Sequence, residues 1–136
     1  TPRSPLRPRR AIMLASTLHE IGHLLYTNQN HLNSLTKDKH LFFILNLCED
    51  IRIDRLLQKK LDYRKICLSA WKLYEWKKDF GSQVVKEIIM RKLKLREFYT
   101  KDKKVKVYIK QHNLLQKVEK IIDLISLSKI DQSFDL

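Results

Sequence analysis

Residues 11–26 of the chain read AIMLASTLHEIGHLLY. Apolar side chains recur in this stretch every three or four residues, which is the spacing that predicts an amphipathic α-helix. At about 100° per residue, one apolar stripe forms along the helix. We expect this stripe to face the core, and its members are Leu14, Leu18, Ile21 and Leu25.

His19 and His23 fall nearly opposite this stripe and belong to His19-Glu20-Ile21-Gly22-His23, an HExxH pattern. Two histidines four residues apart project from one helical face and can chelate a single Zn²⁺, while the adjacent glutamate can polarise a water molecule. The pattern therefore makes His19 and His23 candidate metal ligands and Glu20 the candidate general base. The competing interpretation is two surface histidines with a chance glutamate.

The composition extends the helical prediction to most of the chain. Of 136 residues only two are glycine and three proline, and every proline precedes Arg9. Because strands and tight turns are usually bounded by glycine and proline, which are scarce here, the fold class expected is mainly α. The periodicity predicts helices over 9–26, 38–60, 67–80, 82–99 and 112–128, with a polar loop over 27–36. VKVYI alternates in polarity, which leaves a small β element at 105–109 as a further expectation.

This pattern suggests one domain over 9–127, with the metal site in 9–60 and a helical bundle in 67–127. Residues 1–8 are Pro-rich and basic and are expected to form an extended arm, and 128–136 a frayed tail. The chain lacks an initiator Met, which suggests a piece of a longer protein with further domains.

A third metal ligand is expected on the helix that contains NLCEDIRID, residues 46–54. Glu49 falls there among apolar neighbours, where a carboxylate is costly unless it is paired or binds a metal. Glu49 is the first candidate for the third ligand, and Asp50 replaces it if the helix is rotated about its axis from the orientation that the apolar spacing suggests. Asp50 and Asp54 also suit an outer position that holds a histidine ring N–H. The alternative for Glu49 is an ion pair with Arg52 or Arg55.

HEIGHLLYT together with NLCEDIRID resembles the gluzincin-like metallopeptidase domains found beside von Willebrand factor A modules in phage and bacterial proteins. The resemblance covers about residues 11–58. It implies a zincin-like helical core, zinc bound by His19, His23 and an acid from Glu49-Asp50, and hydrolysis of a protein or peptide substrate with Glu20 as general base. HEIGH also resembles ImmA/IrrE-type peptidases, but the Ala-Asn-x-Phe signature of that family is missing.

Cys48 and Cys67 stand apart from any CxxC pair, so we expect two buried free thiols and a reducing, cytoplasmic location. No apolar run approaches the roughly 20 residues that cross a membrane.

The net charge of +13 favours anionic partners. The alternative function is therefore a basic helical module that binds nucleic acid or protein, with a structural or degenerate metal site. Its expected nucleic-acid patch is the densest basic run, which contains Lys101, Lys103, Lys104 and Lys106.

Overall fold

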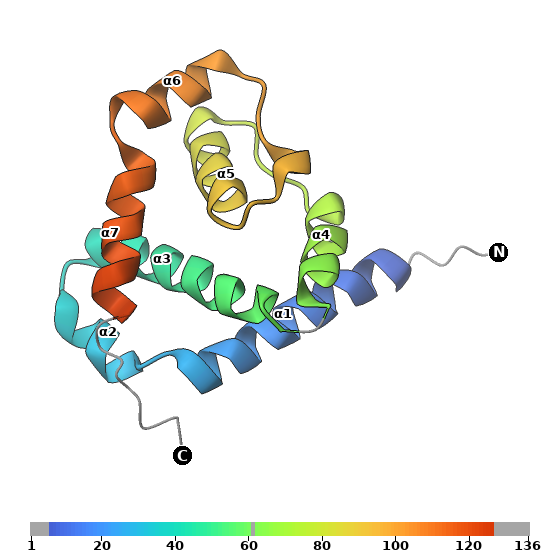
Figure 1. The fold of residues 1–136 in the computed structure, drawn as a ribbon, viewed down its shortest axis with the longest axis horizontal. Helices are drawn as coiled ribbons and strands as arrows, with labels where there is room; N and C mark the ends of the chain where they lie inside the picture. The colour runs from blue at the N-terminus through green and yellow to red at the C-terminus, as the bar shows by residue number, and fades with distance from the viewer. Residues whose placement is uncertain (1–5, 61, 127–136) are drawn as a thin grey trace.

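The computed structural model describes residues 6–60 and 62–126, and over these residues it is mainly α-helical without a strand (Figure 1). Its elements, in chain order, are α1 (Leu6–Tyr26), α2 (Gln29–Leu35), α3 (Lys39–Gln58), α4 (Tyr63–Leu73), α5 (Phe80–Lys92), the 3₁₀ turn η1 (Arg96–Phe98), α6 (Lys103–Gln111) and α7 (Leu114–Ser126).

The β element expected at 105–109 is wrong, because these residues lie within α6. Val105 and Ile109 are buried, whereas Val107 is 58% exposed. A strand would place all three on one face, but a helix brings together residues four apart. Asp102 caps the helix by accepting a hydrogen bond from the backbone N–H of Lys104 at 2.9 Å.

The N-terminal arm expected over 1–8 is wrong for residues 6–8, since α1 begins at Leu6. Proline is tolerated in the first turn of a helix, where its missing N–H would have no intrahelical partner. Pro8 is therefore compatible with this start. Residues 1–5 and the tail expected at 128–136 lie outside the described residues.

Helix α5 ends at Lys92, although the periodicity predicted helix as far as 99. Lys94 adopts a positive φ of 59°. The N–H of Leu95 donates to the carbonyl of Met90 at 2.9 Å, and the N–H of Lys94 donates to that of Arg91 at 3.2 Å. These two bonds form a Schellman motif, which terminates the helix without a glycine.

Helix α5 lies inside a ring formed by α3, α4, α6 and α7, as Figure 1 shows. The main core gathers around it and includes fully buried side chains such as Met90, Leu93 and Leu95. A second, smaller cluster joins α1, α3 and α4 and comprises Ile53, Leu57, Tyr63 and Cys67, with Leu18, Tyr26 and Trp71 packed against it. Helix α1 is thus fixed to the rest of the molecule through this smaller cluster.

Gly22 lies where α1 comes closest to α3. A Cβ atom at this position would be 2.5 Å from Cγ2 of Ile53 and 3.0 Å from Cδ1 of Leu57. Ile53 is completely buried and cannot move aside freely. The missing side chain of Gly22 therefore sets the separation of the two helices.

Three of the four residues in the expected core stripe of α1 are exposed. Leu14, Ile21 and Leu25 are 48%, 41% and 49% exposed, and among the four predicted members Leu18 is the one that packs against the smaller cluster. The side that faces α3 and α4 instead carries Gly22 and the histidines. The interior face of α1 is therefore rotated about the helix axis from the predicted stripe and shares Leu18 with it.

We expect Gly22→Ala to destabilise the protein by about 1–3 kcal/mol, because the overlap with Ile53 exceeds the helix-propensity gain of about 1 kcal/mol. Urea unfolding measures this change. The matched control is Gly81→Ala, where an added Cβ would meet only Oδ2 of Asp79, at 3.6 Å. Equal effects of the two substitutions would contradict a close approach at Gly22.

Glu119 on α7 joins that helix to α3 and α5. Its Oε1 accepts from Arg55 at 2.7 Å and from Lys92 at 2.8 Å, and its Oε2 accepts from Arg55 at 3.0 Å. The hydrogen bonds from Arg55, helped by those from Lys92, lower the pKa of Glu119 from 4.5 to about 2.

A carboxyl group with a lowered pKa stabilises the fold above its unfolded pKa and loses that contribution as the pH falls. We therefore expect Glu119 to contribute fully above pH 4.5 and progressively less down to about pH 2. Glu119→Gln should weaken the fall in urea stability across this interval, with Asp123→Asn on the same helix as control. Parallel pH curves for wild type and Glu119→Gln would contradict the assignment.

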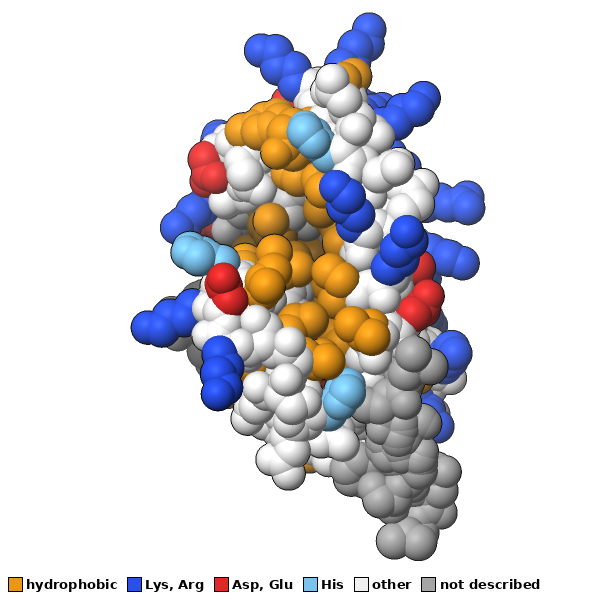
Figure 2. Space-filling view, turned by 90° about the vertical axis from the view of Figure 1, so that its left-hand side faces the viewer, with side chains coloured by type: hydrophobic (Ala, Val, Ile, Leu, Met, Phe, Trp, Pro, Cys, Tyr) orange, Lys and Arg blue, Asp and Glu red, His pale blue; other side chains and the backbone are white. Residues whose placement is uncertain are grey.

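None of the helices in the described part of the chain is long and apolar enough to cross a membrane. Apolar side chains do gather at one surface. Figure 2 shows them in a hollow on the left-hand face of Figure 1, bordered by Lys, Arg and His side chains. Exposed apolar residues of α3 and α7 include Leu41, Ile44 and Leu124.

Candidate metal centre

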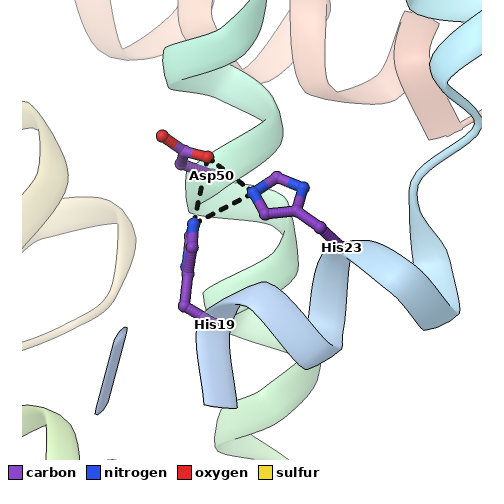
Figure 3. A group of neighbouring side chains, drawn as sticks. All are labelled: His19, His23 and Asp50. Atoms are coloured by element: carbon purple, nitrogen blue, oxygen red, sulfur yellow. Dashed lines mark hydrogen bonds and ion pairs between the residues drawn. The ribbon is translucent and has the colours of Figure 1, made fainter. Parts of the chain in front are cut away.

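Two histidines of α1 and one aspartate of α3 meet at a single point (Figure 3). Oδ1 of Asp50 lies 3.1 Å from Nε2 of His19 and 2.9 Å from Nε2 of His23, and the two Nε2 atoms are 3.0 Å apart. The three potential ligand atoms all lie within 4.8 Å of one another. A metal ion could be held between them.

The close packing of α1 on α3 at Gly22 also brings the two histidines to Asp50. His19 and His23 flank Gly22 on α1, and Asp50 precedes Ile53 by almost one turn of α3. Their rings therefore reach the carboxylate without an intervening layer of side chains.

Asp54 fixes the ring of His19. Nδ1 of His19 lies 2.8 Å from Oδ1 of Asp54, and that oxygen also accepts the Tyr63 hydroxyl at 2.7 Å. Because a carboxylate only accepts, Nδ1 of His19 must carry the proton. The position of Asp54 is the one expected from the sequence for a residue that holds a histidine ring N–H.

Thr27 plays the corresponding role for His23. Its hydroxyl donates to Oε2 of Glu49 at 2.6 Å and lies 2.7 Å from Nδ1 of His23. A hydroxyl has one proton to donate, so Thr27 must accept from His23 Nδ1–H while it donates to Glu49. Nε2 of His23 is therefore the ring nitrogen that faces the centre.

Glu49, the first candidate for the third ligand, occupies a different place. It is completely buried, and Arg52 donates to its two oxygens, from Nε at 2.6 Å and from a terminal nitrogen at 2.8 Å. Arg52 also donates to the backbone carbonyl of Tyr26 at 2.6 Å. The paired alternative for Glu49 thus describes the structure, and Asp50 stands where the third ligand was expected, because the helix is rotated from the orientation that the apolar pattern suggested.

The charges at the centre are strongly coupled. Burial alone would lower the pKa of His19, but hydrogen bonds to Asp50 and Asp54 outweigh it and raise the pKa to about 10. Burial alone would raise the pKa of Asp50, but hydrogen bonds to His19 and His23 lower it to about 2. The arrangement of acceptors therefore attracts positive charge, which either a proton or a metal ion can supply.

The centre is accessible from outside. The side chain of Asp50 is 48% exposed, and those of His19 and His23 are 20% and 25% exposed. Glu20 is exposed as well and lines the same pocket as His19 and Asp50. The ligand side chains are therefore open to solvent.

The two cysteines are free and buried, as the sequence predicted. Burial raises the pKa of Cys48 to about 11 and that of Cys67 to about 12. Both therefore remain thiols near neutral pH and are poor metal ligands.

The basic residues Lys101, Lys103, Lys104 and Lys106 are exposed at the start of α6. Figure 1 shows α6 at the opposite end of the molecule from α1. A nucleic acid bound there would be remote from the metal centre, and this patch stays a prediction.

Comparison with known proteins gives no match to a family model, to a curated protein or to a solved structure.

Thr27→Val should remove the acceptor of His23 Nδ1–H while it preserves the shape of the side chain. We expect a loss of about 1–3 kcal/mol in the free energy of unfolding, since a partly buried hydrogen-bond network loses a member. Nitrogen chemical shifts should show that the Nδ1–H tautomer of His23 is no longer fixed. Thr17→Val, at an exposed position of α1, is the control. An unchanged His23 tautomer in Thr27→Val would contradict the role of Thr27.

Proposed function

We propose that the chain binds a divalent metal ion, zinc first, through His19, His23 and Asp50, and that the site hydrolyses peptide bonds. The observation that carries the proposal is the convergence of three ligand atoms whose partners leave them available to an ion. Both Nδ1 atoms are tied to Asp54 and Thr27, so both Nε2 atoms face Asp50, and a metal ion would take the place of any proton on them.

The donor set fits zinc. Imidazole nitrogen and carboxylate oxygen are both common zinc ligands. Catalytic zinc sites have three protein ligands and keep the fourth position for water or substrate, whereas structural sites have four. Three ligands at an accessible position favour a catalytic site.

When bound, a divalent ion polarises a carbonyl group and lowers the pKa of water. The residues supply the remainder of the mechanism. Glu20, beside the ligands and exposed to the pocket, accepts a proton from the attacking water and delivers it to the leaving amine nitrogen. Asp54 and Thr27 keep the two rings oriented throughout, as outer partners do at metal centres.

Elemental analysis and zinc titration test the metal site. We expect one zinc per chain, a loss of binding in the His19→Ala/His23→Ala double variant, and at least a tenfold weaker affinity in Asp50→Asn, since even outer residues contribute about 10–100-fold. Asp123→Asn on α7 is the matched control. Zinc-bound Glu20→Gln should then cleave an unfolded protein about 10²–10⁴-fold more slowly than wild type.

A folded chain that takes up no zinc overturns the proposal. Zinc binding without cleavage of any unfolded protein would instead support the basic binding module, for which DNA affinity with a steep salt dependence is the direct measurement.

A further inference from the structure

A pocket of about 290 Å³ opens beside the candidate metal centre. His19, Glu20 and Asp50 are among its lining residues. Most of the other lining residues are apolar and come from α1, α3, α4 and α5, with Leu47, Ile51, Ala70, Trp71 and Ile89 among them. The pocket therefore combines the polar groups of the centre with a largely apolar lining.

Two polar side chains of the lining, Tyr63 and Asp54, are already paired with each other. The Tyr63 hydroxyl donates to Asp54, and the same Asp54 oxygen accepts from His19. Burying an unpaired polar group costs free energy, whereas burying an apolar group is favourable in proportion to its area. The interior accordingly favours an apolar occupant.

The volume limits the size of that occupant. A cavity of about 150 Å³ lined by aliphatic and aromatic side chains can hold benzene, and sites for whole drug-sized ligands begin near about 300 Å³. At about 290 Å³ the pocket has room for one aromatic or branched aliphatic group.

The aromatic wall is held in place by its neighbours. The ring of Trp71 stacks on that of Trp76 with centroids 5.2 Å apart and meets the edge of Tyr74 at 5.3 Å. Such contacts restrict rotation of the indole. The pocket is thus formed before a ligand arrives, which lowers the entropic cost of binding.

We propose that this pocket receives a large apolar side chain, aromatic or branched aliphatic, of a peptide whose neighbouring bond lies at the His19–His23–Asp50 centre. The inference rests on the proposed function, because the centre supplies the chemistry and the pocket selects the substrate. Its substrate class is a peptide with such a residue next to the bond that is cleaved.

Zinc-loaded protein and simple hydroxamates test the pocket without requiring turnover. The probes are acetohydroxamate, 4-methylpentanohydroxamate, 3-phenylpropanohydroxamate and the hydroxamate of succinic acid, which ends in a carboxylate. The two tryptophans are Trp71 and Trp76, so Trp76→Phe leaves Trp71 as the fluorescent reporter in the pocket wall. We expect both apolar tails to bind at least about tenfold more tightly than the other two probes.

Ala70→Met should fill the pocket and remove this preference while zinc binding is retained, and Ser69→Met, exposed on the same helix, is the control. If Ala70→Met does not fold, Ile89→Ala replaces it; the wider pocket should shift the preference toward the phenyl tail. Zinc uptake with equal affinity for all four probes overturns the pocket alone. A chain that binds no zinc overturns the proposed function and this inference together.

Discussion

The close approach of α1 to α3 at Gly22 is the constraint on which the rest of the site depends. With Cγ2 of Ile53 at 2.5 Å from the place of a Cβ, no larger residue fits there without a shift of the neighbouring side chains. This contact brings both histidines of α1 within hydrogen-bond distance of Asp50. Gly22, inside the HExxH pattern, therefore sets the helix packing that brings the two histidines to Asp50.

Ionic and polar groups also hold the C-terminal end of α1 against α3. Arg52 joins Glu49 to the backbone carbonyl at the end of α1, and Thr27 connects Glu49 to His23. Breaking a buried pair by removing one partner is costly because the other charge remains. The same groups thus fix the end of α1 and the orientation of a ring, which couples the stability of the fold to the geometry of the centre.

The predictions from the sequence were wrong where the outcome depends on which residues of another helix pack against a side chain. Leu14, Ile21 and Leu25 belong to a regular apolar stripe, yet they are exposed. Helix α1 packs through a rotated face that includes Leu18 and Gly22. Glu49 was correctly expected to be buried, but burial alone could not distinguish a metal ligand from a partner of Arg52. VKVYI was ambiguous for the same reason, since two spacings fit five residues and only the packing of Val105 and Ile109 decided between them.

By itself the sequence determined the mainly helical fold, through its shortage of glycine and proline and its apolar spacing, and it identified the histidine pair, because i and i+4 share a helical face whatever the surroundings. The tertiary structure decided that Asp50 rather than Glu49 faces those histidines, that Asp54 and Thr27 hold their rings, and that α4 and α5 complete a pocket beside them. These are relations between segments far apart in the chain. They depend on the rotation and separation of packed helices, which side-chain contacts set and local spacing does not encode.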